Sequence, residues 1–148
     1  MLQVTMEQCR KRDILVAPPS SPCEDGYFGE LIATQLQTRG VAGLILEAGC
    51  RDLAELTKMG FPVWSRAVSA QGTVKETVGD VNLPVVCAGQ AIHPGDLIVA
   101  DDDGVVVVRR KDAANVLQLS REREEKEAKS RQRYLRGELS LDVAAMRA

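Results

Sequence analysis

The chain has few aromatic residues and no strong excess of charge of either sign. Aromatic residues make up 3% of its 148 residues, so a platform for stacking nucleic-acid bases is not expected. Lysine and arginine number 19 against 21 aspartates and glutamates, which gives a formal net charge of −2. No basic face stands out in the sequence, and we therefore predict no nucleic-acid partner.

Long apolar runs and closely spaced cysteines are also missing. No apolar stretch reaches the length of a membrane span, and no apolar signal region follows Met1. We therefore predict a cytoplasmic protein without a membrane partner. The four cysteines form no Cys-x-x-Cys motif and the chain has one histidine, so neither a zinc site nor a disulfide framework is predicted.

What the sequence does contain is a helix pattern followed by a buried-strand pattern. Residues 30–39 carry apolar side chains at near-helical spacing, and Gly40 follows where a left-handed C-terminal cap would lie. Residues 41–46, VAGLIL, are typical of a strand buried on both faces. If helix and strand run antiparallel in an αβ unit, the start of the helix and the far end of the strand lie on the same side of the sheet.

This arrangement would bring Glu30 close to Arg51 and Asp52. A helix that begins at Glu30 leaves the amides of Leu31 and Ile32 without intrahelical partners, so they can bind an anion. A simpler interpretation is that Arg51 and Asp52 form a surface ion pair, with Asp52 as the N-cap of the next helix. The dipeptide alone favours this simpler interpretation.

The rest of the chain alternates further elements. Strands are expected at residues 13–17, 61–64, 81–88, 92, 96–100 and 104–108, and helices at residues 52–59 and 111–136. The three aspartates at 101–103 lie in a predicted tight turn without the other oxygen ligands of a calcium loop, so no calcium site is predicted there. The pattern indicates an α/β protein.

The second half of the 111–136 helix is almost entirely charged. Such a run is ordinarily a solvated helix face with i,i+4 pairs, here Glu122 with Lys126 and Glu125 with Lys129. The alternative is that this helix crosses a neighbouring subunit.

A carboxylate, twenty residues and then Arg-Asp resembles the signature of the RraA-like superfamily. Within it, the chain is most similar to the class II pyruvate aldolases that act on 4-hydroxy-4-methyl-2-oxoglutarate and 4-carboxy-4-hydroxy-2-oxoadipate in aromatic catabolism. The similarity continues through residues 60–110 and into the segments REREEKEA and LRGELSLD. It implies an α/β fold of the swivelling β/β/α, phosphohistidine-domain-like kind, in a single domain over residues 1–148.

The resemblance also implies a metal site built on the Arg-Asp pair. Asp52 would be the direct protein ligand to Mg²⁺ or Mn²⁺, Arg51 would stabilise the developing enolate oxygen, and Glu30 would orient a metal-bound water. The chain has no lysine clearly placed for a Schiff base, which independently favours a divalent metal as the electron sink. Oxaloacetate decarboxylation, which yields the same enolate, is expected as a side activity.

Substrate contacts and a second subunit complete the implied site. Gly29 and the amides of Leu31 and Ile32 would hold the substrate carboxylate, and Lys75 would contact the substrate. Glu127 would reach the site of the next protomer, with Glu124 or Glu125 taking that role if the alignment contains a gap. The 111–136 helix would then form subunit contacts in a homotrimer or homohexamer.

Two functions remain open from the sequence. The first is the metal-dependent aldolase, and the second is a non-catalytic regulator of the RraA type that binds ribonuclease E or another protein. The joint presence of Glu30, Arg51 and Asp52 favours the aldolase, because a docking module does not need all three. Relative to the resembled aldolases the chain is short at its N-terminus, so we expect an exposed apolar sheet face unless oligomerisation covers it.

Overall fold

The computed structural model describes residues 2–74, 79–144 and 146 of the chain. It has two compact units, residues 1–107 and residues 108–148, and each is described by itself. Lys75 lies outside the described residues. That one domain spans residues 1–148 stays a prediction.

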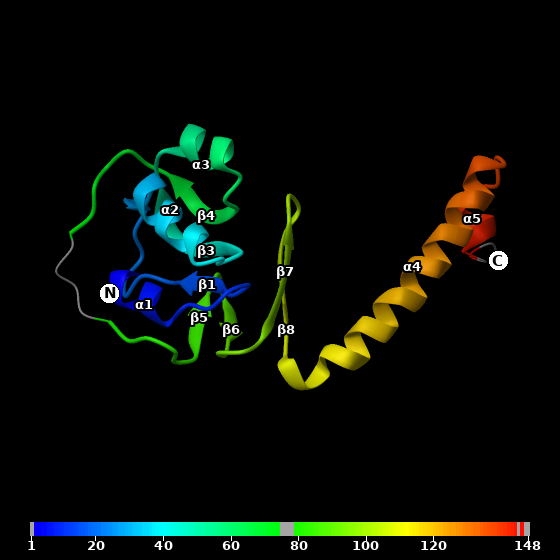
Figure 1. The fold of residues 1–148 in the computed structure, drawn as a ribbon. Helices are drawn as coiled ribbons and strands as arrows, with labels where there is room; N and C mark the ends of the chain where they lie inside the picture. The colour runs from blue at the N-terminus through cyan, green and yellow to red at the C-terminus, as the bar shows by residue number, and fades with distance from the viewer. Residues whose placement is uncertain (1, 75–78, 145, 147–148) are drawn as a thin grey trace. The chain divides into compact units, whose positions relative to one another are not determined.

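A parallel sheet built around β3 forms the centre of the first unit (Figure 1). Its strands are β1 (Ile14–Ala17), β2 (Gly26–Phe28), β3 (Gly43–Cys50) and β4 (Val63–Val68). β4 pairs with β3 from Leu44 to Cys50, while β1 pairs with the first half of β3 and β2 with its last two residues. All three pairings are parallel, so the carboxyl ends of β2, β3 and β4 lie at one edge of the sheet, where ligands bind in open α/β sheets.

β3 is the longest strand of this sheet and the most buried. Every residue from Gly43 to Cys50 is buried except Glu47, which is intermediate. The sequence pattern predicted this strand over residues 41–46, and the strand extends four residues further. Gly49 lies in this extension, and a side chain there would collide with the backbone carbonyls of Glu24 and Asp25.

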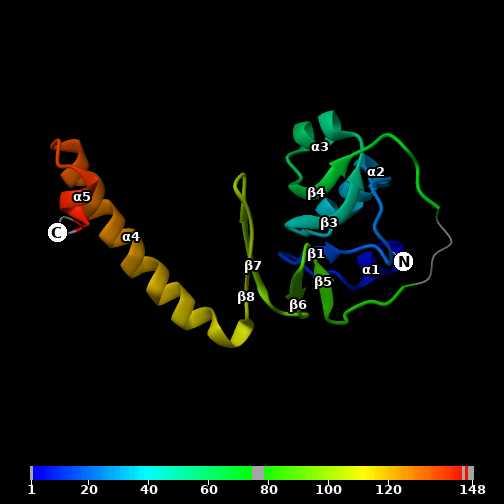
Figure 2. The ribbon, with the colours of Figure 1, turned by 180° about the vertical axis from the view of Figure 1, so that it is seen from behind.

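Helices cover one face of the sheet (Figures 1 and 2). They are α1 (Leu2–Gln8), α2 (Glu30–Thr38) and α3 (Leu53–Met59). The main core lies between them and the strands, with Phe28, Leu36 and Leu44 fully buried. α2 ends as predicted, with Gly40 in a left-handed conformation at φ 76° just beyond it.

Two strand pairs lie against the other face. They consist of β5 (Val85–Cys87) with β6 (Gln90–Ile92), and β7 (Leu97–Asp101) with β8 (Gly104–Val108). Together they form a second apolar cluster around Ile45, Cys87 and Ile92. The Trp64 indole N–H donates to the carbonyl of Asp101 at 2.8 Å, which ties β4 to the β7–β8 turn. β5 occupies only three of the eight residues predicted as a strand at 81–88.

The second unit consists of a short 3₁₀ turn η1 (Arg110–Asp112), the long helix α4 (Ala113–Leu135) and the short helix α5 (Ser140–Val143). α4 is close to the predicted helix and buries none of its own residues within its unit. Its surface pairs include Gln118 with Glu122 and Arg123 with Glu127, both at 2.7 Å. Among the described residues, no helix is both long and apolar enough to span a membrane.

Candidate functional site

The carboxyl edge of the parallel sheet brings Gly29, Glu30, Arg51 and Asp52 together. The amide of Arg51 donates to the carbonyl of Phe28 at 2.8 Å, so the end of β3 is joined to the end of β2. The amide of Glu30 donates to Asp52 Oδ2 at 3.0 Å. Residues that are 22 positions apart in the chain therefore meet, as the helix–strand pattern predicted.

Asp52 does not use its side chain to cap the helix that follows it. It occupies the N-cap position of α3 with φ 58° and ψ 37°, a left-handed conformation, and makes no side-chain capping bond there. The simpler interpretation is thus right about an exposed Arg51–Asp52 ion pair and about the N-cap position, and wrong about capping by the Asp52 side chain. Its carboxylate is instead turned to the first amide of α2, which the sequence pattern could not reveal.

A left-handed backbone is uncommon for a residue with a side chain, although aspartate tolerates it better than most. Strained residues of this kind cluster at functional sites. The Asp52 side chain is 43% exposed, and Arg51 Nε lies 3.8 Å from its Oδ2. The carboxylate is thus held from one side by the amide of Glu30 and open to solvent on another.

Two glycines allow close packing of the backbone at this edge of the sheet. A Cβ atom on Gly29 would collide with Asp52 Oδ2 and would lie 3.0 Å from Arg51 Cγ. A Cβ atom on Gly26 would lie 2.5 Å from the carbonyl oxygen of Ser69. The resemblance placed Gly29 at the substrate carboxylate, and the close packing of both glycines against neighbouring parts of the chain is a finding of the structure.

The start of α2 presents backbone donors at this edge. The first amide, that of Glu30, is taken by Asp52. The amides of Leu31 and Ile32 come next in the first turn of α2, where backbone amides lack intrahelical acceptors. Leu31 as a whole is 80% exposed, and the start of a helix suits an anion.

The carboxylate of Glu30 has a partner that sequence reasoning did not identify. The Thr34 hydroxyl donates to Glu30 Oε1 at 3.0 Å, one helical turn along α2. The i,i+4 spacing of a glutamate and a threonine on one helix is the signal that could have revealed it. Glu30 and Thr34 also line a groove with a volume of about 260 Å³ between α2 and α3.

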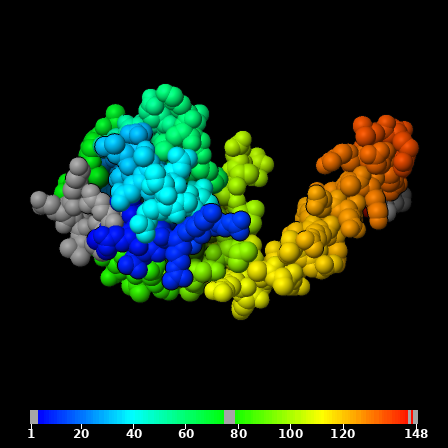
Figure 3. All heavy atoms as spheres, in the orientation of Figure 1, coloured from blue at the N-terminus to red at the C-terminus, as the bar shows by residue number. Residues whose placement is uncertain are grey.

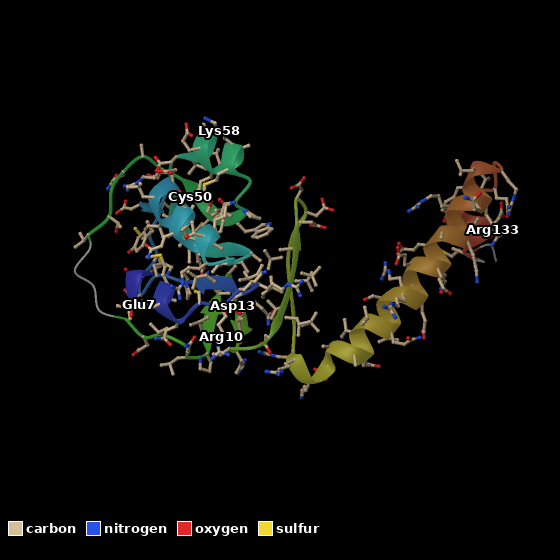
Figure 4. The ribbon with its side chains drawn as sticks, viewed as in Figure 1. Glu7, Arg10, Asp13, Cys50, Lys58 and Arg133 are labelled. Atoms are coloured by element: carbon tan, nitrogen blue, oxygen red, sulfur yellow. The ribbon has the colours of Figure 1, made fainter. Side chains whose placement is uncertain are left out.

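Two of the cysteines, Cys9 and Cys87, have thiols with a raised pKa. Cys50, labelled in Figure 4, is buried. Its Sγ lies 3.2 Å from Ser65 Oγ. Burial raises the pKa of the Cys87 thiol, and the nearby Glu47 carboxylate raises it further. Burial and Asp13 likewise raise the pKa of the Cys9 thiol. A raised pKa keeps a thiol protonated and therefore poorly nucleophilic.

Asp52 could hold a divalent metal only as one part of an open coordination shell. Among the described residues, no three histidine, cysteine, aspartate or glutamate side chains lie close enough together to form a metal cage. Mg²⁺ and Mn²⁺ do not need such a cage, because they are commonly held by one or two carboxylates together with water and substrate oxygens. The single exposed carboxylate of Asp52 fits that kind of site.

Glu127 lies in the second unit, on α4. There its carboxylate accepts a hydrogen bond from Arg123 Nε at 2.7 Å. The i,i+4 pairing on this helix is therefore observed, although between Arg123 and Glu127 rather than the pairs predicted from sequence. The approach of Glu127 to the site of another protomer stays a prediction.

Comparison with known proteins gives the family context. The family model described as "RraA-like: Aldolase/RraA" matches residues 1–107. A protein of Halalkalibacterium halodurans named "Putative 4-hydroxy-4-methyl-2-oxoglutarate aldolase" is 31% identical over 144 residues, which cover 97% of this chain and 66% of that protein. The chain spans between 58% and 66% of the length of the first curated relatives that it matches.

Solved structures share the fold. An uncharacterised protein from Pseudomonas syringae superposes with a TM-score of 0.82 at 24% identity, over 93% of this chain and 70% of that one. Streptomyces coelicolor RraAS2, described as an unusual member of the RNase ES inhibitor RraA protein family, superposes with a TM-score of 0.78 at 27% identity. That match covers 89% of this chain and 68% of the Streptomyces chain. The predicted α/β fold of the RraA-like kind is thus confirmed.

Proposed function

The chain belongs to the RraA-like family, and from that membership we propose that it is a class II pyruvate aldolase. The proposed reaction is the divalent-metal-dependent retro-aldol cleavage of 4-hydroxy-4-methyl-2-oxoglutarate or 4-carboxy-4-hydroxy-2-oxoadipate, which releases pyruvate. Relatives that carry the aldolase name support this class of substrate.

The observation that carries the proposal is the hydrogen bond from the Glu30 amide to Asp52. It holds an acidic side chain, a permanently charged arginine and the start of a helix at the carboxyl edge of one sheet. A 2-oxo acid needs these three features: a carboxylate for a metal, a cation for an oxyanion, and amides for its own carboxylate.

Cleavage of the C3–C4 bond leaves its electron pair on C3 and turns the C4 hydroxyl carbon into a carbonyl. The three-carbon fragment is then the enolate of pyruvate. A divalent metal held by Asp52 would supply the electron sink for that enolate. Arg51 keeps its charge at any working pH and stabilises the negative charge that develops on the 2-oxo oxygen.

The amides of Leu31 and Ile32 bind the substrate carboxylate and fix the orientation of the 2-oxo group. Glu30 accepts, through an ordered water, the proton that leaves the C4 hydroxyl. For this its carboxylate has to turn from Thr34, which holds it in the structure. Glu127 of a second protomer helps to position the same water.

Loss of CO₂ from oxaloacetate yields the same enolate and removes no hydroxyl proton. We therefore expect oxaloacetate decarboxylation as a side activity that depends on Arg51 and Asp52 more than on Glu30. Comparing the two reactions separates enolate stabilisation from proton transfer.

The test is pyruvate release from oxaloacetate and from 4-hydroxy-4-methyl-2-oxoglutarate, with added Mg²⁺ or Mn²⁺ and with EDTA. The expected result is metal-dependent release that Arg51→Ala abolishes with both compounds. The aldolase is rejected if neither compound releases pyruvate in a metal-dependent way while circular dichroism shows that the protein is folded.

A second function is favoured by one structural relative. Streptomyces RraAS2 is described as belonging to a family of RNase ES inhibitors, so this chain could instead act by binding ribonuclease E or another protein. In that case Arg51→Ala would leave the inhibition of ribonuclease E unchanged while pyruvate release stayed absent in every variant.

A further inference from the structure

A groove runs from the candidate site along the two helices that begin there. α2 and α3 lie side by side, and their atoms form one continuous surface in the space-filling view (Figure 3). The groove between them has a volume of about 260 Å³. Its lining consists of Glu30, Thr34, Glu55, Lys58 and Met59.

Hydrogen bonds tie the helices together at both ends of this groove. At the site end, the amide of Glu30 donates to Asp52 Oδ2 at 3.0 Å. At the far end, Gln37 Nε2 donates to the carbonyl of Met59 at 3.0 Å. Seven residue steps separate Glu30 from Gln37, roughly 10 Å along a helix, so the two helices that form the groove are joined at two points about that far apart.

The charges along the groove are distributed unevenly. Glu30 at the site end is already engaged by the Thr34 hydroxyl. Lys58 is the one cation of the lining, on the last turn of α3 (Figure 4). Within the described part of the chain no ion pair is formed by Lys58 and an acidic residue. Glu55 lies one turn before Lys58 on the same helix and opposes the binding of an anion.

We propose that this groove is the subsite for the distal carboxylate of the substrate and that Lys58 determines specificity for it. The inference rests on the aldolase function proposed above. A substrate whose pyruvyl head lies at Asp52 and the α2 amides extends its other end away from the metal ligand, and the groove adjoins Glu30. The flexible four-carbon stem of lysine allows the ammonium group to meet a carboxylate anywhere along the far half.

The two ends of the groove offer different hydrogen-bond donors. The site end offers amides and a permanently charged arginine, which suit the planar 2-oxo acid head. The far end offers an ammonium group with three donors, which suits a single carboxylate of variable position. Glu55 keeps the groove from attracting anions that lack the 2-oxo acid head, because it offsets part of the Lys58 charge.

The test compares two compounds that differ only in the distal group. 4-Hydroxy-4-methyl-2-oxoglutarate has a distal carboxylate and yields two pyruvates, whereas 4-hydroxy-4-methyl-2-oxopentanoate has a methyl group there and yields pyruvate and acetone. The measured quantity is the ratio of kcat/KM for the two compounds, counted per cleavage. In Lys58→Met we expect this ratio to fall about tenfold, mainly through a higher KM for the diacid. This is the effect expected from the loss of one charge-assisted hydrogen bond.

Matched variants make the result specific to the groove. Lys58→Arg should retain most of the ratio because it retains the cation. Glu55→Gln should raise the ratio because it removes the opposing charge. Lys11→Gln changes the net charge by the same amount in an exposed residue that precedes β1, at the other end of the sheet, and should leave the ratio unchanged.

An unchanged ratio in Lys58→Met, with wild-type cleavage of the diacid, overturns the subsite while the aldolase function stands. An equal fall of the ratio in Lys11→Gln also overturns it, since the effect would then be one of overall charge. If the wild type cleaves neither compound, the aldolase itself fails, which is a different and recognisable result.

Discussion

At the scale of single residues, Asp52 has a structural and a chemical function in one carboxylate. Its Oδ2 accepts a hydrogen bond from the amide of Glu30, and this bond fixes the start of α2 against the end of β3. The same side chain is 43% exposed and close to Arg51. A substitution can separate the two functions, because one needs only an acceptor oxygen and the other needs a negative charge.

Asp52→Asn is expected to preserve the fold and remove the activity. Asparagine tolerates the left-handed backbone and can present an amide oxygen to Glu30, so the free energy of unfolding should change by less than about 0.5 kcal/mol. Metal-dependent pyruvate release should fall about a hundredfold or more, because a neutral oxygen binds Mg²⁺ weakly. Urea unfolding and a coupled pyruvate assay measure the two effects.

Asp52→Ala is the informative comparison. It leaves the Glu30 amide without its acceptor and puts alanine in a left-handed conformation, so it should cost about 1–2 kcal/mol of stability. Equal stability losses in the alanine and asparagine variants would show that the hydrogen bond to Glu30 contributes nothing measurable.

Gly29 tests whether the close approach of the backbone matters. A Cβ atom there would collide with Asp52 Oδ2 and press on Arg51, so Gly29→Ala should shift both side chains and lower pyruvate release at least about tenfold. Gly72→Ala is the control, because a Cβ atom there meets nothing within 4 Å. Equal activity in the two alanine variants would contradict the close packing of Gly29 against the Arg-Asp pair.

The residues of the candidate site were readable from the sequence, but their conformations were not. The Glu30 to Arg51-Asp52 spacing on a helix–strand pattern predicted their meeting. Aspartate, however, favours both N-caps and left-handed positions, so the sequence could not decide which helix Asp52 would serve. Lys58 carried no signal at all, because the groove depends on how two helices pack.

At the scale of elements, one face of α2 packs in the core and another is exposed beside the candidate site. Leu36 is fully buried in the core below the helix, whereas Leu31 is 80% exposed beside the candidate site. Elements with a strong apolar period, such as α2 and β3, were predicted to within a few residues. β5 was overpredicted, because VNLPVV is as apolar as a strand but contains a proline and an early turn.

The two leucines of α2 provide a matched pair. Leu36→Ala removes a fully buried side chain and should lower the free energy of unfolding by about 2–5 kcal/mol. Leu31→Ala should change it by less than about 0.5 kcal/mol, and should retain pyruvate release because the proposed contact of Leu31 is its backbone amide. Chemical denaturation measures the first effect and the coupled assay the second. A large activity loss in Leu31→Ala would show that its side chain, not its amide, serves the site.

An ion pair links the end of α4 to the segment that precedes α5. Arg133 Nε donates to Glu138 Oε2 at 2.7 Å, and this hydrogen bond lowers the pKa of the Glu138 carboxyl, with a contribution from Arg136. Because the folded pKa is the lower one, the stabilising effect is present above the ordinary glutamate pKa of about 4.3 and is lost as pH falls through the folded value.

We therefore expect the end of α4 to loosen at acidic pH, as seen by faster amide exchange near Glu138. In Arg133→Gln, the carboxyl titration of Glu138 followed by NMR should move to higher pH. An unmoved titration midpoint in this variant would contradict the pairing. Arg121→Gln, which removes a charge elsewhere on α4, serves as the control.

At the scale of the whole molecule, the candidate site supplies fewer groups than the proposed reaction uses. The first unit contributes Asp52, Arg51, the α2 amides and Glu30, while Glu127 belongs to the second unit and pairs there with Arg123. α4 buries none of its residues within its own unit, and it exposes Leu117, Leu119 and Leu135, which contact with another chain would cover. A trimer or hexamer in which α4 serves the neighbouring site would account for both facts.

Subunit complementation tests this assembly directly. Arg51→Ala and Glu127→Ala are each expected to lower pyruvate release strongly in homogeneous preparations. If each site combines Arg51 of one protomer with Glu127 of its neighbour, random mixing after reversible dissociation creates sites with both wild-type residues, and activity should recover to on the order of a quarter of wild type. Light scattering confirms that the mixture reassembles.

Recovery should be absent when Arg51→Ala is mixed with Asp52→Asn, because both changes then lie on the same side of every interface. A mixture of Arg51→Ala and Glu127→Ala that reassembles fully yet stays inactive would show that Glu127 does not complete a neighbouring site.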